Sequence, residues 1–368
     1  MPGVVSMHEH SETQSKPSYF RGQCWGAVGV VLGSLELCFC LPLTLRIHQG
    51  FVHLGAAPES PLGLGERVVQ MALRFAVEQD RPAYLVLDAF FPIAAVFRAA
   101  QSVYSVALKQ PYLHILVRAK KNYVGYLPAP PKPPSRPGPQ ARYGEKVVLV
   151  ECFDHEHLFD TAECQVYGQR ETVRLMTLSL LWKPLGEPLL FILAVTSRGQ
   201  LVLMSSDLTL SALNALELYC ARTRIETMFA MLKQLLGAFR FRFWSKYLPK
   251  HARRPRANKH LQPPAPEHIA AVRACWNACE VFVLCAAIAH GLLQLIALRF
   301  DTHIWQQHHG YLRTQSRRLP SERTVKQVLA PQVLRQFVDL ASVGLNVKIQ
   351  RCVDRAEDDE TPPFRWSA

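Results

Sequence analysis

Aspartate is absent from the first part of this 368-residue chain, in which Asp80 is the first to occur. Asp80 stands in the segment Gln79-Asp80-Arg81-Pro82, whose composition predicts a turn rather than a strand. Any site that needs an aspartate on one of the first strands is therefore excluded. The carboxylates before Asp80 all belong to glutamates, namely Glu9, Glu12, Glu36, Glu59, Glu66 and Glu78.

Acidic residues are also missing between Glu226 and Glu267, a stretch that is rich in cations. The whole chain has 42 Lys and Arg against 29 Asp and Glu, and the net charge of +13 predicts a polyanionic partner. Interleaved aromatic residues would place flat surfaces beside phosphate-neutralising charges, although a solvated basic loop is the alternative. The cations are Lys233, Arg240, Arg242, Lys246, Lys250, Arg253, Arg254, Arg256 and Lys259, and the aromatics are Phe239, Phe241, Phe243, Trp244 and Tyr247.

Zinc-finger spacing is missing as well. Most of the ten cysteines lie in apolar runs, where cysteine behaves as a small hydrophobic residue. The pair Cys275-x3-Cys279 has no second pair with matching spacing, so a structural zinc site is not predicted. We expect reduced thiols in a cytosolic compartment.

A signal peptide is not indicated either, because the first seventeen residues are polar and contain no apolar core. Two apolar runs remain. Residues 25–43 include Glu36 and suit a buried strand pair, whereas residues 281–298 have a borderline length for a membrane span. A buried helix has the same hydropathy, and it is the structure that we expect for 281–298. A membrane-associated protein that uses this helix is the alternative.

The remaining pattern is that of an α/β protein with a sizeable core, since 49% of the residues are hydrophobic. A strand–helix–strand unit at 84–88, 92–108 and 113–119 predicts parallel pairing and puts Asp88 at the carboxyl end of a strand. The other expected elements are a hairpin at 26–32 and 38–47, helices at 64–79, 210–236, 267–300 and 321–340, and a run of strands within 146–203 that follows the proline-rich segment 128–139.

Four residues of the helix expected at 210–236 share one stripe. Tyr219, Arg222, Glu226 and Lys233 are spaced Y-x2-R-x3-E-x6-K, and side chains 3, 4 and 7 residues apart lie on one helix face. One carboxylate, two cations and a tyrosine make a poor packing face. They are suited to holding a phosphodiester beside a metal ion.

This spacing resembles the signature of DDE transposases of the insertion-sequence-four type, and further stretches resemble the family at 84–89, 202–208 and 243–246. The resemblance covers residues 19–300. It implies a ribonuclease H-like mixed sheet with flanking helices and a β-rich insertion between the second catalytic Asp and the catalytic Glu. The implied divisions are an incomplete first part of the core (1–127), a proline-rich linker and insertion (128–205), a second part of the core with the signature helix (206–300) and a helical C-terminal region with a tail (301–368).

The resemblance also implies a catalytic metal site. The family uses three carboxylates to hold Mg²⁺ or Mn²⁺; Asp88 matches the second and Glu226 matches the third. No residue matches the first, so we expect the chain to begin beyond that ligand and any activity to be impaired. Asp207 could be a third ligand or, as the preferred alternative, a cap of the signature helix together with Thr209 or Ser211.

The implied partner is double-stranded DNA at transposon ends, bound by a homodimer in a synaptic complex without a membrane, in the bacterial cytoplasm at the nucleoid. Tyr219, Arg222 and Lys233 would hold phosphates, and a DNA track would continue through Arg240, Arg242 and Lys246. Trp182 and Trp244 could stack on an unpaired base, but we expect both to be buried. The predicted function is that of a transposase fragment, with a non-catalytic DNA-binding remnant as the alternative.

Overall fold

The computed structural model describes residues 1–8, 19–34, 37–55, 62–120, 122–132, 138–248, 250, 262–310 and 319–340, and among these the side chains of 334–340 are not described. The chain divides into two compact units, residues 1–291 and 292–368. It is a mixed α/β protein, as predicted, with an eight-stranded mixed sheet and flanking helices in the first unit.

The strand–helix–strand unit at the edge of this sheet confirms the predicted parallel pairing. β5 (Ala83–Leu87) runs parallel to β8 (Leu113–Arg118). The sheet order is β10-β9-β12-β13-β14-β8-β5, and β11 pairs with β12. The six remaining strands are β9 (Val124–Pro128), β10 (Tyr143–Val148), β11 (Asp160–Val166), β12 (Gln169–Trp182), β13 (Glu187–Thr196) and β14 (Gly199–Ser205).

The helix expected at 92–108 is shorter than predicted, because α2 covers only Ala94–Gln101. The Ser102 hydroxyl donates to the carbonyl of Ala99 at the helix end. A small hairpin of β6 (Tyr104–Ser105) and β7 (Gln110–Pro111) then follows. Serine and β-branched residues are weak helix formers, which explains the early end.

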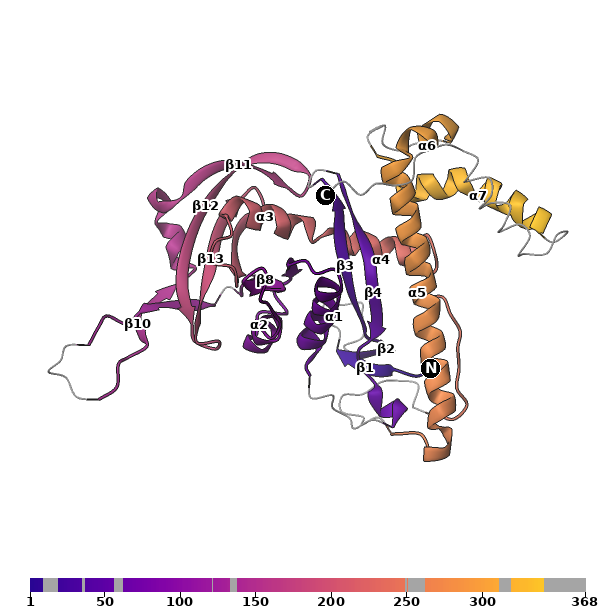
Figure 1. Ribbon diagram of the computed structural model, residues 1–368, viewed down its shortest axis with the longest axis horizontal. Helices are drawn as coiled ribbons and strands as arrows, with labels where there is room; N and C mark the ends of the chain where they lie inside the picture. The colour runs from indigo at the N-terminus through magenta and orange to yellow at the C-terminus, as the bar shows by residue number, and fades with distance from the viewer. Residues whose placement is uncertain are drawn as a thin grey trace. The chain divides into compact units, whose positions relative to one another are not determined.

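Helices cover both faces of the sheet (Figure 1). Along β8, Ile115 and Val117 face the core that includes α1 (Leu64–Glu78) and α2, whereas Leu116 faces α3 (Ala212–Ala221). This alternation is the period of two that a strand with both faces covered requires. The sheet is therefore held between α1 and α2 on one face and α3 on the other.

A second core lies around the predicted hairpin, which is confirmed as β3 (Trp25–Gly33) and β4 (Cys38–Ile47). Two helices pack against this hairpin, α4 (Arg224–Gln234) and α5 (Ile269–Arg299). Smaller elements complete the first unit: β1 (Val4–His8), β2 (Tyr19–Gln23) and the 3-10 helices η1 (Phe51–Leu54), η2 (Glu151–Asp154), η3 (Glu156–Leu158) and η4 (Pro266–His268).

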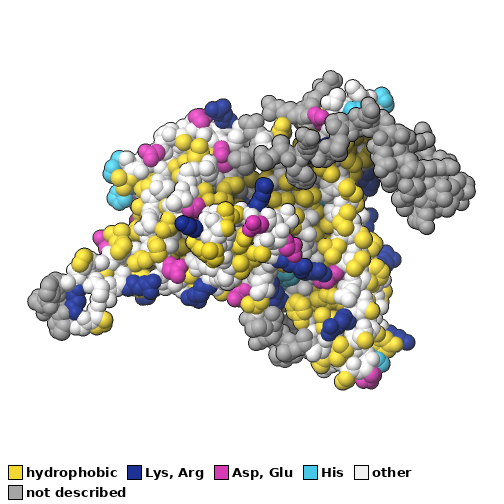
Figure 2. Space-filling model, in the orientation of Figure 1, with side chains coloured by type: hydrophobic (Ala, Val, Ile, Leu, Met, Phe, Trp, Pro, Cys, Tyr) yellow, Lys and Arg dark blue, Asp and Glu magenta, His cyan; other side chains and the backbone are white. Residues whose placement is uncertain are grey.

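The helix expected at 267–300 is confirmed as α5. With its preceding turn it spans Pro266–Arg299 and, among the described residues, is the one helix long and apolar enough to cross a membrane. Only 44% of its most apolar window is buried, so the prediction of a buried helix holds for one face only. The buried face contains polar Glu280 and His290, and hydrophobic side chains are exposed along α5 in Figure 2.

The second unit contains α6 (Asp301–Gln307), which was not predicted, and α7 (Glu322–Leu340), which confirms the helix expected at 321–340. The Ser321 hydroxyl accepts the N–H of Thr324 at the start of α7. Gln294 donates to the carboxylate of Glu322 over 3.1 Å. These contacts are the local reasons why α7 begins where it does.

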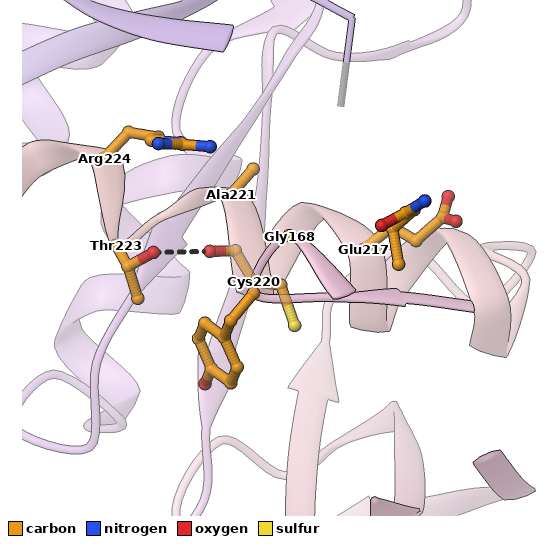
Figure 3. Close-up of a pocket in the computed structure, with 8 residues that line it drawn as sticks. Gly168, Glu217, Cys220, Ala221, Thr223 and Arg224 are labelled. Carbon is orange, nitrogen blue, oxygen red and sulfur yellow. Dashed lines mark hydrogen bonds between the residues drawn. The ribbon is translucent and has the colours of Figure 1, made fainter. Parts of the chain in front are cut away.

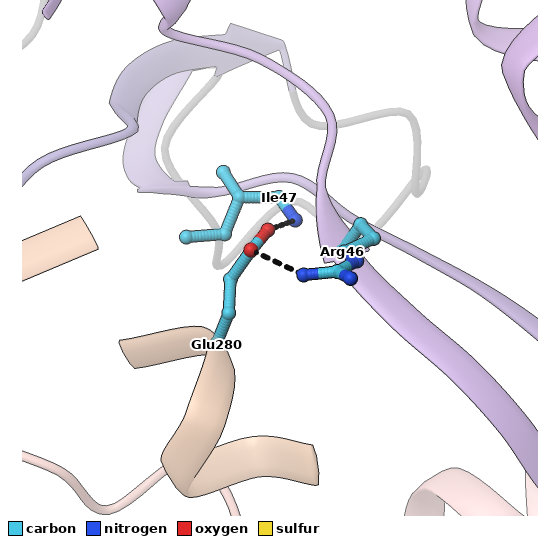
Figure 4. Close-up of polar contacts among 3 residues, drawn as sticks. All are labelled: Arg46, Ile47 and Glu280. Carbon is cyan, nitrogen blue, oxygen red and sulfur yellow. Dashed lines mark hydrogen bonds and ion pairs between the residues drawn. The ribbon is translucent and has the colours of Figure 1, made fainter. Parts of the chain in front are cut away.

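One carboxylate attaches α5 to the hairpin core. Glu280 is 7% exposed, and its Oε1 accepts the backbone N–H of Ile47 over 2.9 Å. Its Oε2 accepts from Nη1 of Arg46 over 2.8 Å, so both oxygens are paired with the end of β4 (Figure 4). A buried carboxylate is tolerated only with such partners.

Replacing this carboxylate should destabilise the first unit. In Glu280→Ala the Ile47 N–H loses its acceptor in a buried position, and we expect unfolding free energy to fall by about 2–4 kcal/mol. Arg46 is half exposed, so Arg46→Ala should cost only about 0.5–1 kcal/mol. Urea unfolding followed by tryptophan fluorescence measures both, and equal losses in the two variants would contradict the assignment.

Candidate functional site

The helix expected at 210–236 is interrupted, and the prediction of one continuous helix is wrong. α3 ends at Ala221 and α4 begins at Arg224. Across the break, the N–H groups of Thr223, Ile225 and Glu226 bond to carbonyls three residues earlier, which is the tighter 3-10 pattern. The Thr223 hydroxyl also donates to the Cys220 carbonyl, and such back-bonding by threonine bends helices.

Three residues of the predicted stripe remain in contact across this break. The Arg222 guanidinium lies 5.6 Å from the centre of the Tyr219 ring, and its Nη2 is 3.6 Å from Oε1 of Glu226. Tyr219 is buried in the core beneath α3, whereas the Glu226 side chain is 71% exposed. Lys233 is exposed and lies 6.0 Å from the Phe229 ring. The stripe therefore passes from the core at Tyr219 to solvent at Glu226.

Asp88 lies at the end of the sheet that the carboxyl end of α3 approaches. It follows β5, and the parallel register puts it next to Arg118 at the end of β8. The phenol of Tyr167 connects this end to α3. Burial and the neighbouring Cys220 and Tyr219 raise the pKa of Tyr167, and Arg118 is close enough to oppose that rise. Asp88 and the carboxyl end of α3 are thus directed to the same end of the sheet.

The described carboxylates do not fit a two-ion metal site. Among the residues that the structure describes, no group of three His, Cys, Asp or Glu could hold a metal ion. Asp88 accepts the N–H of Phe90 over 2.9 Å, and Glu226 is paired with Arg222. Two-ion phosphoryl transfer needs several carboxylates around both ions, so no metal-dependent step follows from these positions.

Asp207 has a structural role in the loop before α3. Its Oδ1 accepts the backbone N–H of Thr209 over 2.9 Å, and its Oδ2 accepts from the Tyr84 hydroxyl. The helix cap is Ser211, whose hydroxyl accepts the N–H of Asn214. β14 runs antiparallel to β8 and delivers Asp207 toward the amino ends of β5 and β8. Asp88 lies at their carboxyl ends, so the two aspartates are directed apart.

In the segment after α4, which contains the predicted DNA track, packed aromatic side chains alternate with exposed side chains. Phe239 packs on Trp25 with ring centres 5.5 Å apart. Phe241 stacks on Phe243 over 5.7 Å, and Phe243 contacts Phe282 of α5 over 5.9 Å. The alternate positions are exposed, and we call them the basic strip: Arg240, Arg242, Trp244 and Lys246.

This alternation changes the roles expected of the aromatic residues. The three phenylalanines are anchors that face the hairpin core and α5, not surfaces offered to a ligand. Trp182 is 4% exposed, which confirms its predicted burial. Trp244 is 72% exposed, so the prediction that it is buried is wrong. Lys250 is exposed, whereas Arg253, Arg254, Arg256 and Lys259 lie outside the described residues.

Sequence reasoning missed two cations beside the turn between β11 and β12. The Arg198 guanidinium lies 4.2 Å from the centre of the Tyr167 ring. Arg224 lines a small pocket of about 100 Å³ beside the break between α3 and α4 (Figure 3). Tyr167 and Gly168 both have positive φ, and they form the tight turn between β11 and β12. A local pattern could have predicted this turn. The contact between the turn and α3 is tertiary, and therefore no local pattern predicts it.

Comparison with models of protein families finds no match, and no curated protein matches the chain. The resemblance to DDE transposases therefore stays a prediction that depends on the motifs themselves.

The contact between Tyr84 and Asp207 predicts a pH dependence. Partial burial raises the pKa of Asp207, but the hydrogen bonds from Tyr84 and Thr209 and the nearby His114 outweigh burial, so the net pKa is lowered. The associated stability should be present near pH 7 and should be lost as the pH falls through the lowered pKa. We expect Tyr84→Phe to raise the pKa of Asp207 in a carboxyl NMR titration.

Tyr112→Phe is the matched control, because Tyr112 makes a comparable bond to Asp80 elsewhere on the surface. It should leave the titration of Asp207 unchanged. An unchanged pKa of Asp207 in Tyr84→Phe would show that the tyrosine does not hold this carboxylate.

Proposed function

We propose that this chain is a DNA-binding protein related to the DDE transposases of the insertion-sequence-four type. The observation that carries the proposal is the basic strip, in which three cations and one exposed tryptophan lie on the outer side of a segment anchored by three phenylalanines. An anchored segment holds its charges in place before binding, which lowers the entropic cost of association.

The spacing of the strip suits a sugar–phosphate backbone. Arg240, Arg242 and Lys246 alternate with packed side chains on the exposed side of the segment, so they form a row of long donors. Such donors position a protein on phosphates without reading base sequence. Trp244 adds a flat exposed surface on which an unpaired base could stack.

The carboxylates support a relationship to the transposase core. Asp88 follows a strand of a parallel pair, a run of strands comes next, and Glu226 lies in the first turn of the helix that begins after the break. This order is compatible with a ribonuclease H-like core that carries a β-rich insertion. Transposon-end duplex DNA would be the partner, with Arg222 and Lys233 close to the scissile phosphate and Tyr219, which is 4% exposed, supporting Arg222 from the core.

We propose that strand cleavage is impaired, because two carboxylates hold Mg²⁺ or Mn²⁺ more weakly than three. A transposase fragment with residual cleavage and a non-catalytic DNA-binding remnant are the two forms of the proposal. A cytoplasmic location, with the protein bound to bacterial DNA, suits both forms.

Removing the cations of the strip should weaken binding to DNA. For Arg240→Ala/Arg242→Ala/Lys246→Ala we expect weaker binding to a mixed-sequence 30-bp duplex, since up to three phosphate contacts are lost. The slope of log K against log salt should decrease by up to about 2.7, from roughly 0.9 per contact. Fluorescence anisotropy at several salt concentrations measures both quantities.

The matched control removes three exposed cations elsewhere, in Arg74→Ala/Lys109→Ala/Arg170→Ala. Its net charge equals that of the strip variant, so a general electrostatic effect would weaken both variants alike. Equal salt slopes in the two variants would contradict a binding role for the strip.

Cleavage distinguishes the two forms of the proposal. With supercoiled plasmid and either Mg²⁺ or Mn²⁺, we expect the wild-type chain to nick DNA no faster than Glu226→Gln. Both proteins should still bind the 30-bp duplex, because Glu226 is not part of the strip. Metal-dependent nicking that disappears in Glu226→Gln would contradict this expectation and would identify the chain as the transposase fragment with residual cleavage.

A further inference from the structure

A second stretch of the chain is rich in cations and free of acidic residues, and the proposed function does not use it. No Asp or Glu occurs between Asp88 and Glu145, whereas eight Lys and Arg do, and seven of the twelve residues at 128–139 are proline. The described parts of this region, 124–132 and 138–148, form a hairpin around β9 and β10 that we call the arm. β10 leads away from the rest of the sheet in Figure 1, and Lys and Arg side chains lie along the arm in Figure 2.

Hydrogen bonds hold the arm in place. The side-chain amide of Gln140 accepts the N–H of Lys132 over 2.8 Å and donates to the carbonyl of Pro130 over 2.8 Å, so it ties the two legs of the arm together. At the base of the arm, the Arg142 guanidinium donates to the carbonyl of Gly186 in the turn between β12 and β13. An arm that is fixed in this way loses little conformational freedom when it binds a partner.

One face of the arm carries cations beside aromatic rings. Lys146 lies directly opposite Tyr126 in the register, and directly opposite residues share a face of the ribbon. The ammonium of Lys183 lies 6.0 Å from the centre of the Tyr126 ring, and the ring of Tyr143 lies 5.5 Å from it. Lys146 and Lys183 are exposed. The arm contains one acidic residue, Glu145, against three cations of its own. Long donors on one face suit the phosphates that border a groove of DNA.

Beyond this face the legs of the arm are slender. Residues 129–131 and 138–141 consist of proline, alanine, glycine and one glutamine, and Pro130 and Pro131 are exposed. The minor groove of B-DNA is about 6 Å wide, against about 12 Å for the major groove, so slender legs suit the minor groove. Proline is one of the apolar residues that minor-groove proteins place against bases. Charge and shape together therefore favour DNA over a protein domain whose aromatic groove recognises proline.

We propose that the arm lies in the minor groove of duplex DNA and makes binding depend on base composition. In the minor groove a G·C pair presents the N2 amino group of guanine, which an A·T pair lacks. This group would obstruct prolines that approach the floor of the groove, so A·T pairs should be favoured. The inference rests on the proposed function in one respect, that the chain binds duplex DNA, but it concerns a different surface from the basic strip.

Three duplexes of about 30 bp test the inference by fluorescence anisotropy. They share their flanking sequences and differ in a central block of A·T, G·C or inosine·cytosine pairs. Inosine lacks the N2 amino group, so its pair with cytosine resembles A·T in the minor groove and G·C in the major groove. We expect the wild-type chain to bind the A·T and inosine·cytosine duplexes equally, and at least about 5-fold more tightly than the G·C duplex.

Shortening the arm should remove this preference. In a full chain whose residues 130–140 are replaced by an Asn-Gly turn, we expect the three duplexes to bind with equal affinity. Lys132→Ala/Lys146→Ala/Lys183→Ala keeps the arm but should lower the slope of log K against log salt by up to about 2.7. The triple variant that serves as the control for the basic strip has the same net charge, and it should keep the preference. Circular dichroism should show that all variants are folded.

The strip variant Arg240→Ala/Arg242→Ala/Lys246→Ala separates this inference from the proposed function. It should bind all three duplexes more weakly and keep the preference for A·T and inosine·cytosine. A strip variant that binds as tightly as the wild type and keeps the preference would contradict the role of the strip and still support the arm.

Three results would overturn the inference. An inosine·cytosine duplex that binds like the G·C duplex would place the arm outside the minor groove. A shortened arm that leaves all three affinities unchanged would assign the arm to another partner, such as a protein domain that recognises proline. A wild-type chain that binds none of the duplexes would overturn the inference together with the proposed function.

Discussion

The buried carboxylate of Glu280 is the constraint on which the attachment of α5 to the hairpin core depends. Its bonds to Ile47 and Arg46 fix both the position and the rotation of α5 against β4. That placement brings Phe282 to the phenylalanines beneath the basic strip. It also turns Val281 and Ile288 outward. One buried carboxylate with two partners thus orients two surfaces with different chemistry, one cationic and one apolar.

Much of this arrangement could be predicted from local patterns. The hairpin, the strand–helix–strand unit and α5 follow from hydrophobic periods and proline positions, because those signals lie within each segment. The predictions for the helices at 92–108 and 210–236 were wrong for a local reason that the hydrophobic period does not show. The Ser102 hydroxyl donates to a backbone carbonyl where α2 ends, and the Thr223 hydroxyl donates to one at the break between α3 and α4. The apolar spacing continues past both positions.

The site was harder to predict because its geometry depends on contacts between distant segments. Phe241 and Trp244 are both aromatic residues among cations, and the sequence alone does not show which of them faces inward. The difference is made by Phe282, which gives Phe241 a partner, whereas Trp244 is exposed. Arg198 was missed for the same reason, since only the fold brings it to Tyr167.

The break at Thr223 has a consequence for the way the stripe is organised. α3 places Tyr219 in the core of the sheet, whereas α4 places Met228 and Leu232 in the core of the hairpin. A straight helix would present one face throughout, but a bend lets consecutive turns satisfy two cores that are oriented differently. Arg222 and Glu226 lie on either side of that bend. The distance between Arg222 and Glu226 therefore depends on how the core of the sheet and the core of the hairpin are oriented relative to each other. A ligand that contacts both side chains would favour one orientation of the two cores.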